Sequence, residues 1–548
     1  MQGLMMDAPL LTSTILDHAE RWHGEQKIVS RLHDGSIHSY TYSDAHTRTK
    51  KMAAALTALG VEQGDRVGTL AWNNFRHFEL YFAISGMGAV THTINPRLFE
   101  EQVTYIINHA SNKVLFVDLS FVGLVEKVIG NCPKVEKIIV LCEQNEMPTD
   151  SPIADLICYE ALIAAQTGDY VWPEFEERTA AALCYTSGTT DNPKGVLYSH
   201  RSTVLQTMAT VAPDVLNISA CDSLLPIVPM YHVNAWCQPF AAALVGAKLV
   251  LPGGGMDAAS IYELMETEGV TLSAGVPTIW LMLLRYLAEN NSKLTTVSRV
   301  SVGGSACPLS IIRDFDTKYG VNVIQAWGMT ETSPLGTVVA PKPEHAKLDV
   351  ETRYQVQSTQ GRPVFGVDIR IIDDNGTELA RDGVMSGHLQ VRGYWVCSEY
   401  FNVDMDSPLE NGWFPTGDIA SISTSGFLRI TDRAKDLIKS GGEWISSIEL
   451  ENAATSLAGV TEAAVIGVSH PRWDERPLML IIANDSTLGK HDIIAHLQDK
   501  FAKWWLPEDV LFVDDIPHTA TGKISKLNLR QQYQDHFMQN NNEESTCA

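Results

Sequence analysis

The sequence lacks a long hydrophobic run, an excess of basic residues and any paired-cysteine motif. Its most apolar windows, such as Leu244–Leu251, are far shorter than the roughly 20 residues that cross a membrane, and the N-terminus shows no secretory signal pattern. The formal net charge of −24 argues against nucleic acid as a partner, because phosphate neutralisation requires basic surface. Nine scattered cysteines without CxxC spacing indicate reduced thiols in a cytoplasmic protein.

A chain of 548 residues is too long for a single hydrophobic core, so at least two domains are expected. Up to about residue 360, short apolar runs such as Lys113–Val117 alternate with segments of helical periodicity such as Ser43–Leu59, which indicates βα units and a mostly parallel sheet. From about 361 to 431, short strands separated by DDNG, RDG, ENG and STSG turns favour an antiparallel, barrel-like subdomain. The remaining residues are typical of a compact α+β segment. We therefore predict an α/β fold with an N-terminal domain of residues 1–432 and a C-terminal domain of residues 433–548.

A cluster of small and hydroxyl residues, Tyr185–Gly195 with the sequence YTSGTTDNPKG, follows the strand-like stretch AALC. Its hydroxyl groups can donate to an anion, Gly188 lets the backbone approach closely, and Lys194 supplies a positive charge. The glycine spacing and the lysine position differ from those of the GxxxxGK[ST] P-loop. Because the loop follows a predicted strand, it lies where ligands bind in open α/β sheets, beyond the carboxyl ends of the strands. For this cluster alone, an ordinary polar loop is the alternative interpretation.

Further motifs follow in order along the chain: PMYHVNAW (229–236), GGSACP (303–308), QAWGMTE (325–331), PTGD (415–418), DRAKDLIKSGGEWIS (432–446) and TGKISK (521–526). Together with the 185–195 loop, they resemble the motifs of the acyl-adenylate-forming enzymes, which include acyl-CoA synthetases, adenylation domains of peptide synthetases and firefly-type luciferases. The resemblance covers roughly Leu11 to Arg530, nearly the whole chain. It implies that a carboxylate attacks the α-phosphate of ATP to give an acyl-adenylate and pyrophosphate, after which a thiol displaces AMP.

The resemblance implies a site for ATP and Mg²⁺. Lys523 matches the family's lysine that bridges the carboxylate and the α-phosphate, a task suited to a compact charge on a flexible stem. Glu331, joined by Thr186, matches the magnesium ligands, and Mg²⁺ prefers few carboxylates together with phosphate oxygens. Asp418 can accept both ribose hydroxyls, and Arg433 can donate to the same sugar. The implied ATP-binding residues are Thr186, Ser187, Gly188, Thr189, Thr190, Lys194, Gly304, Ser305, Ala306, Gln325, Ala326, Trp327, Gly328, Met329, Thr330, Asp418, Arg433 and Lys523, where Trp327 flanks the adenine unless it is a core residue.

The resemblance also implies a mobile C-terminal domain that rotates about a hinge at Lys435 between the two half-reactions. The rotation would withdraw Lys523 and bring KSGGEW (439–444) to the active site, where glycines let a thin pantetheine arm pass. The implied coenzyme A contacts are Trp236, Lys439, Gly441, Gly442, Trp444 and Glu475. The chain ends soon after the lysine loop, which favours free coenzyme A over a fused carrier domain. A homodimer is expected, because members of the family are commonly dimers.

The acid is expected to bind beside PMYHVNAW. Since the substrate is already a carboxylate at pH 7, no catalytic base is needed and His232 is assigned to positioning, with a satisfied core histidine as the alternative. Trp236 stands four residues further on, one turn along a helix, where its indole would shorten the acyl tunnel and favour a short apolar acid. The implied acyl-binding residues are His232, Val233, Trp236, Gly303, Gly304, Gly328, Met329 and Pro334.

The residues of the motifs most resemble those of one subgroup. It contains the medium-chain fatty acyl-CoA synthetases and the bacterial 3-methylmercaptopropionyl-CoA ligases of dimethylsulfoniopropionate breakdown. A thioether acid has about the length of a C5–C6 fatty acid, so residue identities leave both substrates open. We favour 3-(methylthio)propanoate, with a short- or medium-chain fatty acid as the alternative. Luciferase-like oxidation of an adenylate, and nucleotide binding without catalysis, are less favoured hypotheses.

Overall fold

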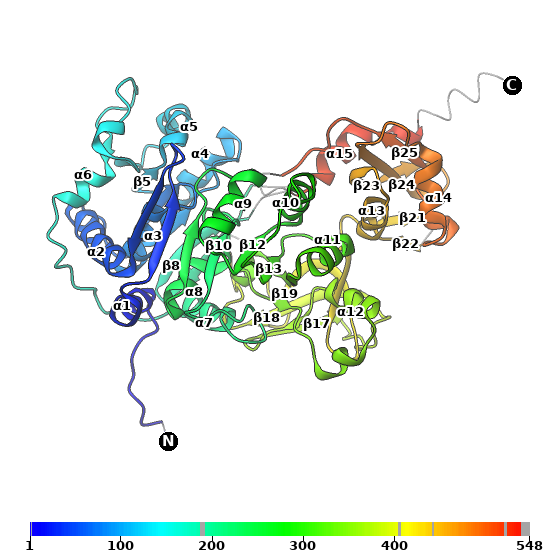
Figure 1. The fold of residues 1–548 in the computed structure, drawn as a ribbon, viewed down its shortest axis with the longest axis horizontal. Helices are drawn as coiled ribbons and strands as arrows, with labels where there is room; N and C mark the ends of the chain where they lie inside the picture. Colours follow the sequence, from blue (N-terminus) through cyan, green and yellow to red (C-terminus); the bar gives the residue numbers. More distant parts are fainter. Residues whose placement is uncertain (2, 187–191, 404–406, 441–442, 520–522, 539–548) are drawn as a thin grey trace.

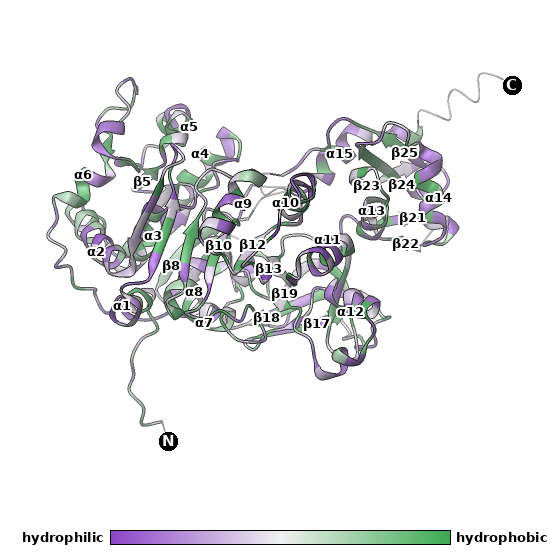
Figure 2. Cartoon of the chain, in the orientation of Figure 1, coloured by the Kyte–Doolittle hydropathy of each residue, from purple (hydrophilic) through white to green (hydrophobic). Residues whose placement is uncertain are grey.

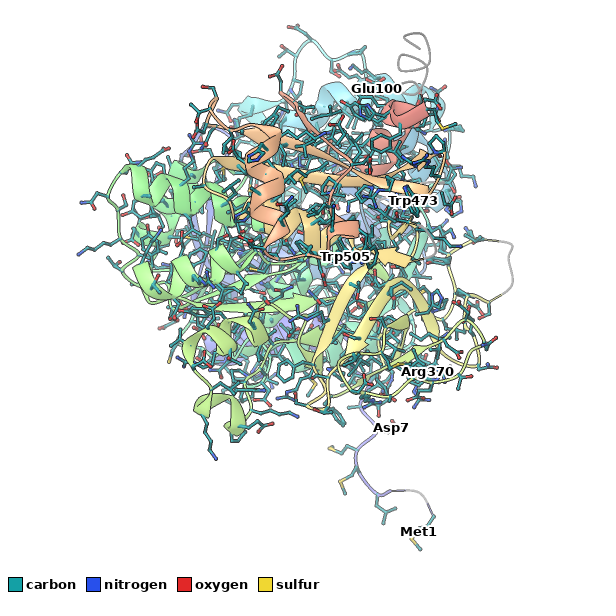
Figure 3. All side chains as sticks on the ribbon, turned by 90° about the vertical axis from the view of Figure 1, so that its right-hand side faces the viewer. Met1, Asp7, Glu100, Arg370, Trp473 and Trp505 are labelled. Carbon is teal, nitrogen blue, oxygen red and sulfur yellow. The ribbon has the colours of Figure 1, made fainter. Side chains whose placement is uncertain are left out.

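The computed structural model describes residues 1, 3–186, 192–403, 407–440, 443–519 and 523–538 (Figure 1). A large N-terminal part contains two mainly parallel sheets and a smaller antiparallel sheet, and the C-terminal part has its own sheet. Figure 1 shows the C-terminal part, in orange and red, to one side of the large part, with the segment before α15 extending toward α10. Met1 and Asp7 lie on a segment that leads away from the body of the protein (Figure 3).

A seven-stranded sheet has the order β7-β6-β5-β3-β4-β8-β9, and its neighbours pair in parallel except for the antiparallel pair of β8 and β9. Its strands are β3 (Arg66–Leu70), β4 (Val90–Thr93), β5 (Val114–Val117), β6 (Lys137–Val140), β7 (Ile157–Cys158), β8 (Ala180–Tyr185) and β9 (Gly195–Ser199). The strands β4 and β5 are buried along their whole length. Burial on both faces explains why short continuous apolar runs predicted these strands.

A nine-stranded sheet has the order β16-β15-β14-β13-β12-β10-β11-β1-β2. Its strands are β1 (Lys27–Arg31), β2 (Ile37–Thr41), β10 (Ser223–Pro226), β11 (Lys248–Leu251), β12 (Leu272–Gly275), β13 (Arg299–Val302), β14 (Asn322–Trp327), β15 (Thr337–Val338) and β16 (Arg362–Pro363). The strands from β14 to β1 in this order pair in parallel, and antiparallel strands complete both ends. The central strands of both large sheets are coloured mainly as hydrophobic in Figure 2, in line with their burial.

Helices separate the strands and pack on the sheets. They are α1 (Thr12–His23), α2 (Tyr42–Ala58), α3 (Phe75–Gly86), α4 (Glu100–Ala110), α5 (Val122–Val128), α6 (Tyr159–Ala164), α7 (His200–Thr210), α8 (Gln238–Val245), α9 (Ala258–Thr267), α10 (Pro277–Glu289), α11 (Leu309–Asp314) and α12 (Val350–Gln357). Every residue of α3 is buried, and the Asn74 side chain caps this helix by accepting from the His77 backbone N–H. None of the helices in the described part of the chain combines the length and the apolar character that a membrane span requires.

The β-rich subdomain is a four-stranded antiparallel sheet of β17 (Val367–Ile372), β18 (Gly387–Gly393), β19 (Phe414–Ile422) and β20 (Leu428–Arg433). The C-terminal part contains β21 (Ile438–Ser440), β22 (Glu443–Ile445), α13 (Ser447–Thr455), β23 (Val460–His470), β24 (Asp474–Ala483), α14 (Lys490–Gln498), β25 (Asp509–Phe512) and α15 (Lys526–Tyr533). Figure 3 places Trp473 and Trp505 on this part. The proposed boundary at residue 433 coincides with the end of β20.

The parallel strands bring distant motifs to one edge of the sheets. β8 leads into the 186–194 loop, β10 into residues 227–237, and β13 into Gly303. β14 ends at Trp327, so the QAWGMTE motif continues from that strand. Because parallel strands of one sheet end at the same edge, the segments after β10, β13 and β14 lie at one edge of the nine-stranded sheet. The loop after β8 of the other sheet meets them there, since Thr186 and His232 line one pocket.

Candidate active site

A buried carboxylate at the end of the small sheet forms the first part of the site. Asp418 on β19 is 2% exposed, and its Oδ1 lies 2.9 Å from Nε of Arg433 on the paired strand β20. The indole Nε1 of Trp327 donates to Asp418 Oδ2 at 3.3 Å. Burial raises the pKa of Asp418, while Arg433 and Lys523 oppose the rise. Trp327 is also 9% exposed and packs in the core, and its contact with adenine stays a prediction.

Lys523 brings a positive charge from the C-terminal part to this carboxylate. Loss of hydration, followed by the positive charge of Arg433, lowers the pKa of the Lys523 ammonium to about 8. The negative charges of Asp418 and Glu331 act in the opposite direction. Lys523 as a residue keeps contact with solvent, so dissolved ions screen part of these interactions. The predicted lysine, the predicted ribose acceptor and the predicted magnesium ligand therefore share one electrostatic site.

Glu331 is 7% exposed and has a partner that the sequence motifs did not indicate. The phenol of Tyr400 donates to Glu331 Oε1 at 2.7 Å. The ammonium of Lys194 lies 5.0 Å from the centre of the Tyr400 ring. Tyr400 thus links the predicted magnesium carboxylate to the lysine of the phosphate loop. Its surroundings in the sequence, CSEYF, contain no pattern that would identify it.

The phosphate loop leaves β8 and returns on β9. The Thr186 backbone N–H donates to the Lys194 carbonyl at 2.9 Å, and the Lys194 N–H donates to Thr186 Oγ1 at 3.1 Å. These two bonds close the neck of the loop. Of the predicted loop residues, Ser187, Gly188, Thr189 and Thr190 lie outside the described residues.

The two predicted magnesium ligands carry oxygen atoms of the type that Mg²⁺ prefers. Glu331 offers a carboxylate and Thr186 a hydroxyl, which suits a small, hard cation that also binds phosphate oxygens. No cluster of three or more histidine, cysteine, aspartate or glutamate side chains with metal-binding geometry occurs among the described residues. The donor set therefore fits a magnesium ion that arrives with a nucleotide.

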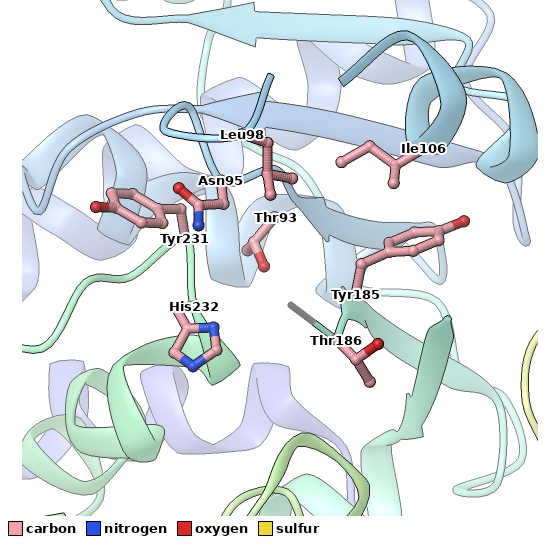
Figure 4. A pocket seen from close by; sticks show the side chains of 8 residues that line it. All are labelled: Thr93, Asn95, Leu98, Ile106, Tyr185, Thr186, Tyr231 and His232. Carbon is pink, nitrogen blue, oxygen red and sulfur yellow. The ribbon is translucent and has the colours of Figure 1, made fainter. Parts of the chain in front are cut away.

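A narrow pocket of about 10 Å³, partly open to solvent, lies beside the neck of the loop (Figure 4). Its lining comprises Thr93, Asn95, Leu98, Ile106, Tyr185, Thr186, Tyr231 and His232. The sequence motifs identified Thr186 and His232 but missed the residues after β4, because TINPRLF carries no chemical pattern. Burial and the positive charge of Lys523 lower the pKa of His232 to about 4, so this imidazole is neutral at pH 7. A neutral ring next to Lys523 suits positioning by hydrogen bonding and contact.

The segment after His232 does not form the turn of right-handed helix that was expected between His232 and Trp236. Val233–Cys237 all have positive φ, between 46° and 57°, so the chain makes a left-handed turn. For residues other than glycine, this conformation costs about 1 kcal/mol or more each, and the surrounding core must stabilise it. Trp236 nevertheless reaches the predicted partner, since a Cβ built on Gly303 would lie 2.9 Å from its indole Cη2. The indole covers the end of β13 from this turn.

The remaining predicted residues lie on the loops after β13 and β14. Gly328 meets the backbone so closely that an added Cβ would overlap the Pro334 carbonyl, and this contact fixes glycine at the position. The Thr330 carbonyl accepts from the Tyr198 phenol at 2.7 Å. Gly304 and Ser305 are exposed, Gln325 is buried, and Ala306, Ala326 and Met329 are partly buried.

The hinge residue follows the strand that carries Arg433, and most of the predicted coenzyme A residues lie beyond it in the C-terminal part. Lys435 is exposed just beyond β20, and its carbonyl accepts from Arg530 of α15 at 3.2 Å. Lys439 on β21 pairs with Trp444 on β22, and the Lys439 N–H donates to Glu475 Oε2 at 3.0 Å. These residues therefore form one group within the C-terminal part. Gly441 and Gly442 lie outside the described residues.

Comparison with known proteins identifies the family of the chain. Residues 16–401 match the AMP-binding enzyme family, and residues 449–523 match the AMP-binding enzyme C-terminal domain. The chain belongs to the AMP-binding enzyme family.

Relatives and solved structures match over almost the whole length. The chain is 48% identical to a medium-chain-fatty-acid–CoA ligase of Ectopseudomonas oleovorans over 536 residues, covering 98% of each chain. It is also 48% identical to a 3-methylmercaptopropionyl-CoA ligase of Ruegeria lacuscaerulensis, covering 98% of this chain and 99% of the relative. The crystal structure of the anthranilate CoA ligase AuaEII with anthranoyl-AMP shares the fold, with a TM-score of 0.86 at 24% identity over 96% of this chain and 98% of that chain. The predicted family resemblance, the α/β fold and the acid–thiol ligase class, which uses ATP and coenzyme A, are confirmed.

Proposed function

We propose that this protein activates 3-(methylthio)propanoate with ATP and transfers the acyl group to coenzyme A. The observation that carries the mechanism is the meeting of Lys523 with Asp418, Arg433 and Glu331, which come from opposite sides of the domain boundary. Lys523 stays exposed as a residue, and its positive charge acts on these groups from the C-terminal part. It fits the site when an anionic nucleotide and an anionic acid share it.

In the first half-reaction a carboxylate oxygen bonds to the α-phosphorus while the bond from phosphorus to the pyrophosphate oxygen breaks. Lys523 offsets the negative charge that gathers between the two reactants. Asp418 accepts from the ribose hydroxyls, and Lys194 with the hydroxyls of its loop holds the departing pyrophosphate. Mg²⁺, held by Glu331 and Thr186, supplies further charge neutralisation on the phosphates when bound.

In the second half-reaction the thiol sulfur bonds to the acyl carbon while the bond from that carbon to the AMP oxygen breaks, and the thiol proton passes to solvent. We propose that rotation about Lys435 removes Lys523 and presents Lys439 and its neighbours on β21 and β22. The pairing of β21 with β22, and the bond from Lys439 to Glu475, support a preformed unit that moves as one piece.

The choice of acid rests on Trp236, whose indole covers the end of β13, because a bulky ring at this position favours a short chain. The relative named 3-methylmercaptopropionyl-CoA ligase supports a thioether acid, and the equally similar medium-chain relative supports fatty acids as the second candidate. A panel of C2–C12 acids, 3-(methylthio)propanoate and benzoate, scored by kcat/KM for coenzyme A-dependent AMP release, tests both. The thioether acid should rank first. A clear preference for C10–C12 acids would contradict the short pocket, and no AMP with any acid would refute the ligase assignment.

A further inference from the structure

The layer behind Trp236 contains buried polar groups that lack a hydrogen-bond partner among the described residues. Gln238, two residues after Trp236, is 0% exposed, and neither its amide oxygen nor its amide nitrogen has such a partner. A buried amide without partners is strongly disfavoured, because it has lost its bonds to water and gained none. This side chain therefore requires a ligand or an ordered water molecule.

Ser301 on β13 presents a second such group in the same layer. Its hydroxyl is buried and has no partner among the described residues. Ser301 pairs in register with Ala274 and Ile324, which both belong to the core cluster that contains Phe240 and contacts Trp236. Gly303, against which the Trp236 indole packs, lies two residues further along the strand and so shares its face. The Ser301 hydroxyl therefore lies on the face of the sheet that Trp236 covers, two residues before Gly303 in the chain.

The third group is Gln206 on α7, which is 1% exposed and whose amide oxygen has no partner in the described part of the chain. Figure 1 shows α7 and α8 side by side, and both helices contact the left-handed turn of Val233–Cys237. Gln238 begins α8, which runs back along β10 and β11, so this residue lies at the carboxyl end of the strands. This is the edge at which the active site is built.

We propose that Gln238 and Ser301, with Gln206, form a hydrogen-bonding floor of the acyl pocket, and that this floor selects acids with an acceptor or donor atom near the far end of a short chain. The inference rests on the proposed ligase function and names the substrate class more closely. Ala235, Cys237 and Phe240 belong to the apolar cluster against which Trp236 packs, so the polar floor discriminates within otherwise apolar surroundings. An alkyl acid would cover these groups without satisfying them.

The test compares acids of equal length that differ at one atom: 3-(methylthio)propanoate, 3-methoxypropanoate and pentanoate. In the unaltered enzyme, kcat/KM for the sulfur and oxygen acids should exceed that for pentanoate by about tenfold, the effect of one buried hydrogen bond gained in place of an unsatisfied amide. Gln238→Leu should bring this ratio close to one, through loss on the heteroatom acids and no loss on pentanoate. Ser301→Ala should shift the ratio in the same direction.

Ser273→Ala is the matched control. Ser273 lies on the neighbouring strand β12, and its hydroxyl donates to the Leu225 carbonyl at 2.6 Å on the opposite face of the sheet. Its loss should change kcat/KM for all three acids alike. Gln238→Met keeps the length of the side chain and replaces Gln238→Leu where the leucine variant fails to fold.

The outcomes distinguish a failure of the polar floor from a failure of the proposed ligase function. An unchanged acid preference in Gln238→Leu or Gln238→Met would show that water alone satisfies the amide and would overturn the polar floor. The same conclusion follows from an unaltered enzyme that prefers pentanoate, even if neither variant folds. Absence of AMP formation with every acid would instead overturn the proposed ligase function, and the floor with it.

Discussion

The reactivity of the site should depend on pH through Lys523. Loss of hydration and the charge of Arg433 lower the pKa of this ammonium to about 8, from the ordinary value of 10.5. Adenylation requires the protonated form, because only the ammonium offsets the charge between carboxylate and phosphate. The rate of adenylation should therefore fall as pH rises through the folded-state pKa.

A pKa of about 8 leaves roughly nine-tenths of Lys523 protonated at pH 7, about half at pH 8 and about one-tenth at pH 9. The effect on folding has the opposite sign. Between pH 8 and 10.5 the unfolded chain binds more protons at this residue, so this group makes unfolding less favourable as pH rises. A loss of adenylation above pH 8 is thus not explained by unfolding that originates at Lys523.

The assay is pyrophosphate release without coenzyme A, at limiting ATP and saturating acid from pH 6.5 to 9.5, since kcat/KM reports the enzyme before ATP binds. We expect a decrease of about tenfold per pH unit above pH 8. Lys523→Arg keeps a charge throughout this range and should give a lower but flat profile. A flat profile in the unaltered enzyme, or the same fall in Lys523→Arg, would refute the reasoning.

Three further predictions concern single side chains. Lys523→Ala should abolish adenylation yet retain thioester formation from supplied acyl-adenylate, and Lys435→Pro should do the reverse by fixing the hinge; equal losses in both half-reactions would contradict domain rotation. Tyr400→Phe removes the hydrogen bond to Glu331 and should raise the Mg²⁺ concentration needed for half-maximal adenylation by about tenfold, with an unchanged requirement as the contrary result. Trp236→Ala should raise kcat/KM for octanoate relative to pentanoate by about tenfold, and a constant ratio would remove the indole from the control of chain length.

The strands could be predicted from sequence because a strand that is buried on both faces consists of a continuous run of apolar residues. The run Lys113–Val117 predicted a strand, and β5 spans Val114–Val117. The helix predicted over Ser43–Leu59 is α2, Tyr42–Ala58. In each case a local apolar pattern and the nearby turn residues agree with the tertiary structure, so local and long-range preferences point to one answer.

The left-handed turn at Val233–Cys237 could not be predicted, because its sequence VNAWC contains none of the glycines that normally signal positive φ. Contacts made only in the folded chain stabilise it, such as that of Trp236 with Gly303. Tyr400 was missed for a related reason. Its role depends on a hydrogen bond to a residue 69 positions away, which no local spacing records.

The division of the site between two domains has a chemical consequence. The proposed acyl pocket, from His232 to the polar floor at Ser301, belongs wholly to the large domain, whereas Lys523 belongs to the small one. The proposed rotation about Lys435 would therefore exchange Lys523 for the proposed coenzyme A contacts on β21 and β22 without disturbing the bound acyl group. The acid is then selected once, before ATP is consumed, and the second half-reaction uses the acyl group that was selected. A change at the floor should accordingly alter acid preference in the adenylation step and leave the rate of thioester formation from a given acyl-adenylate nearly unchanged.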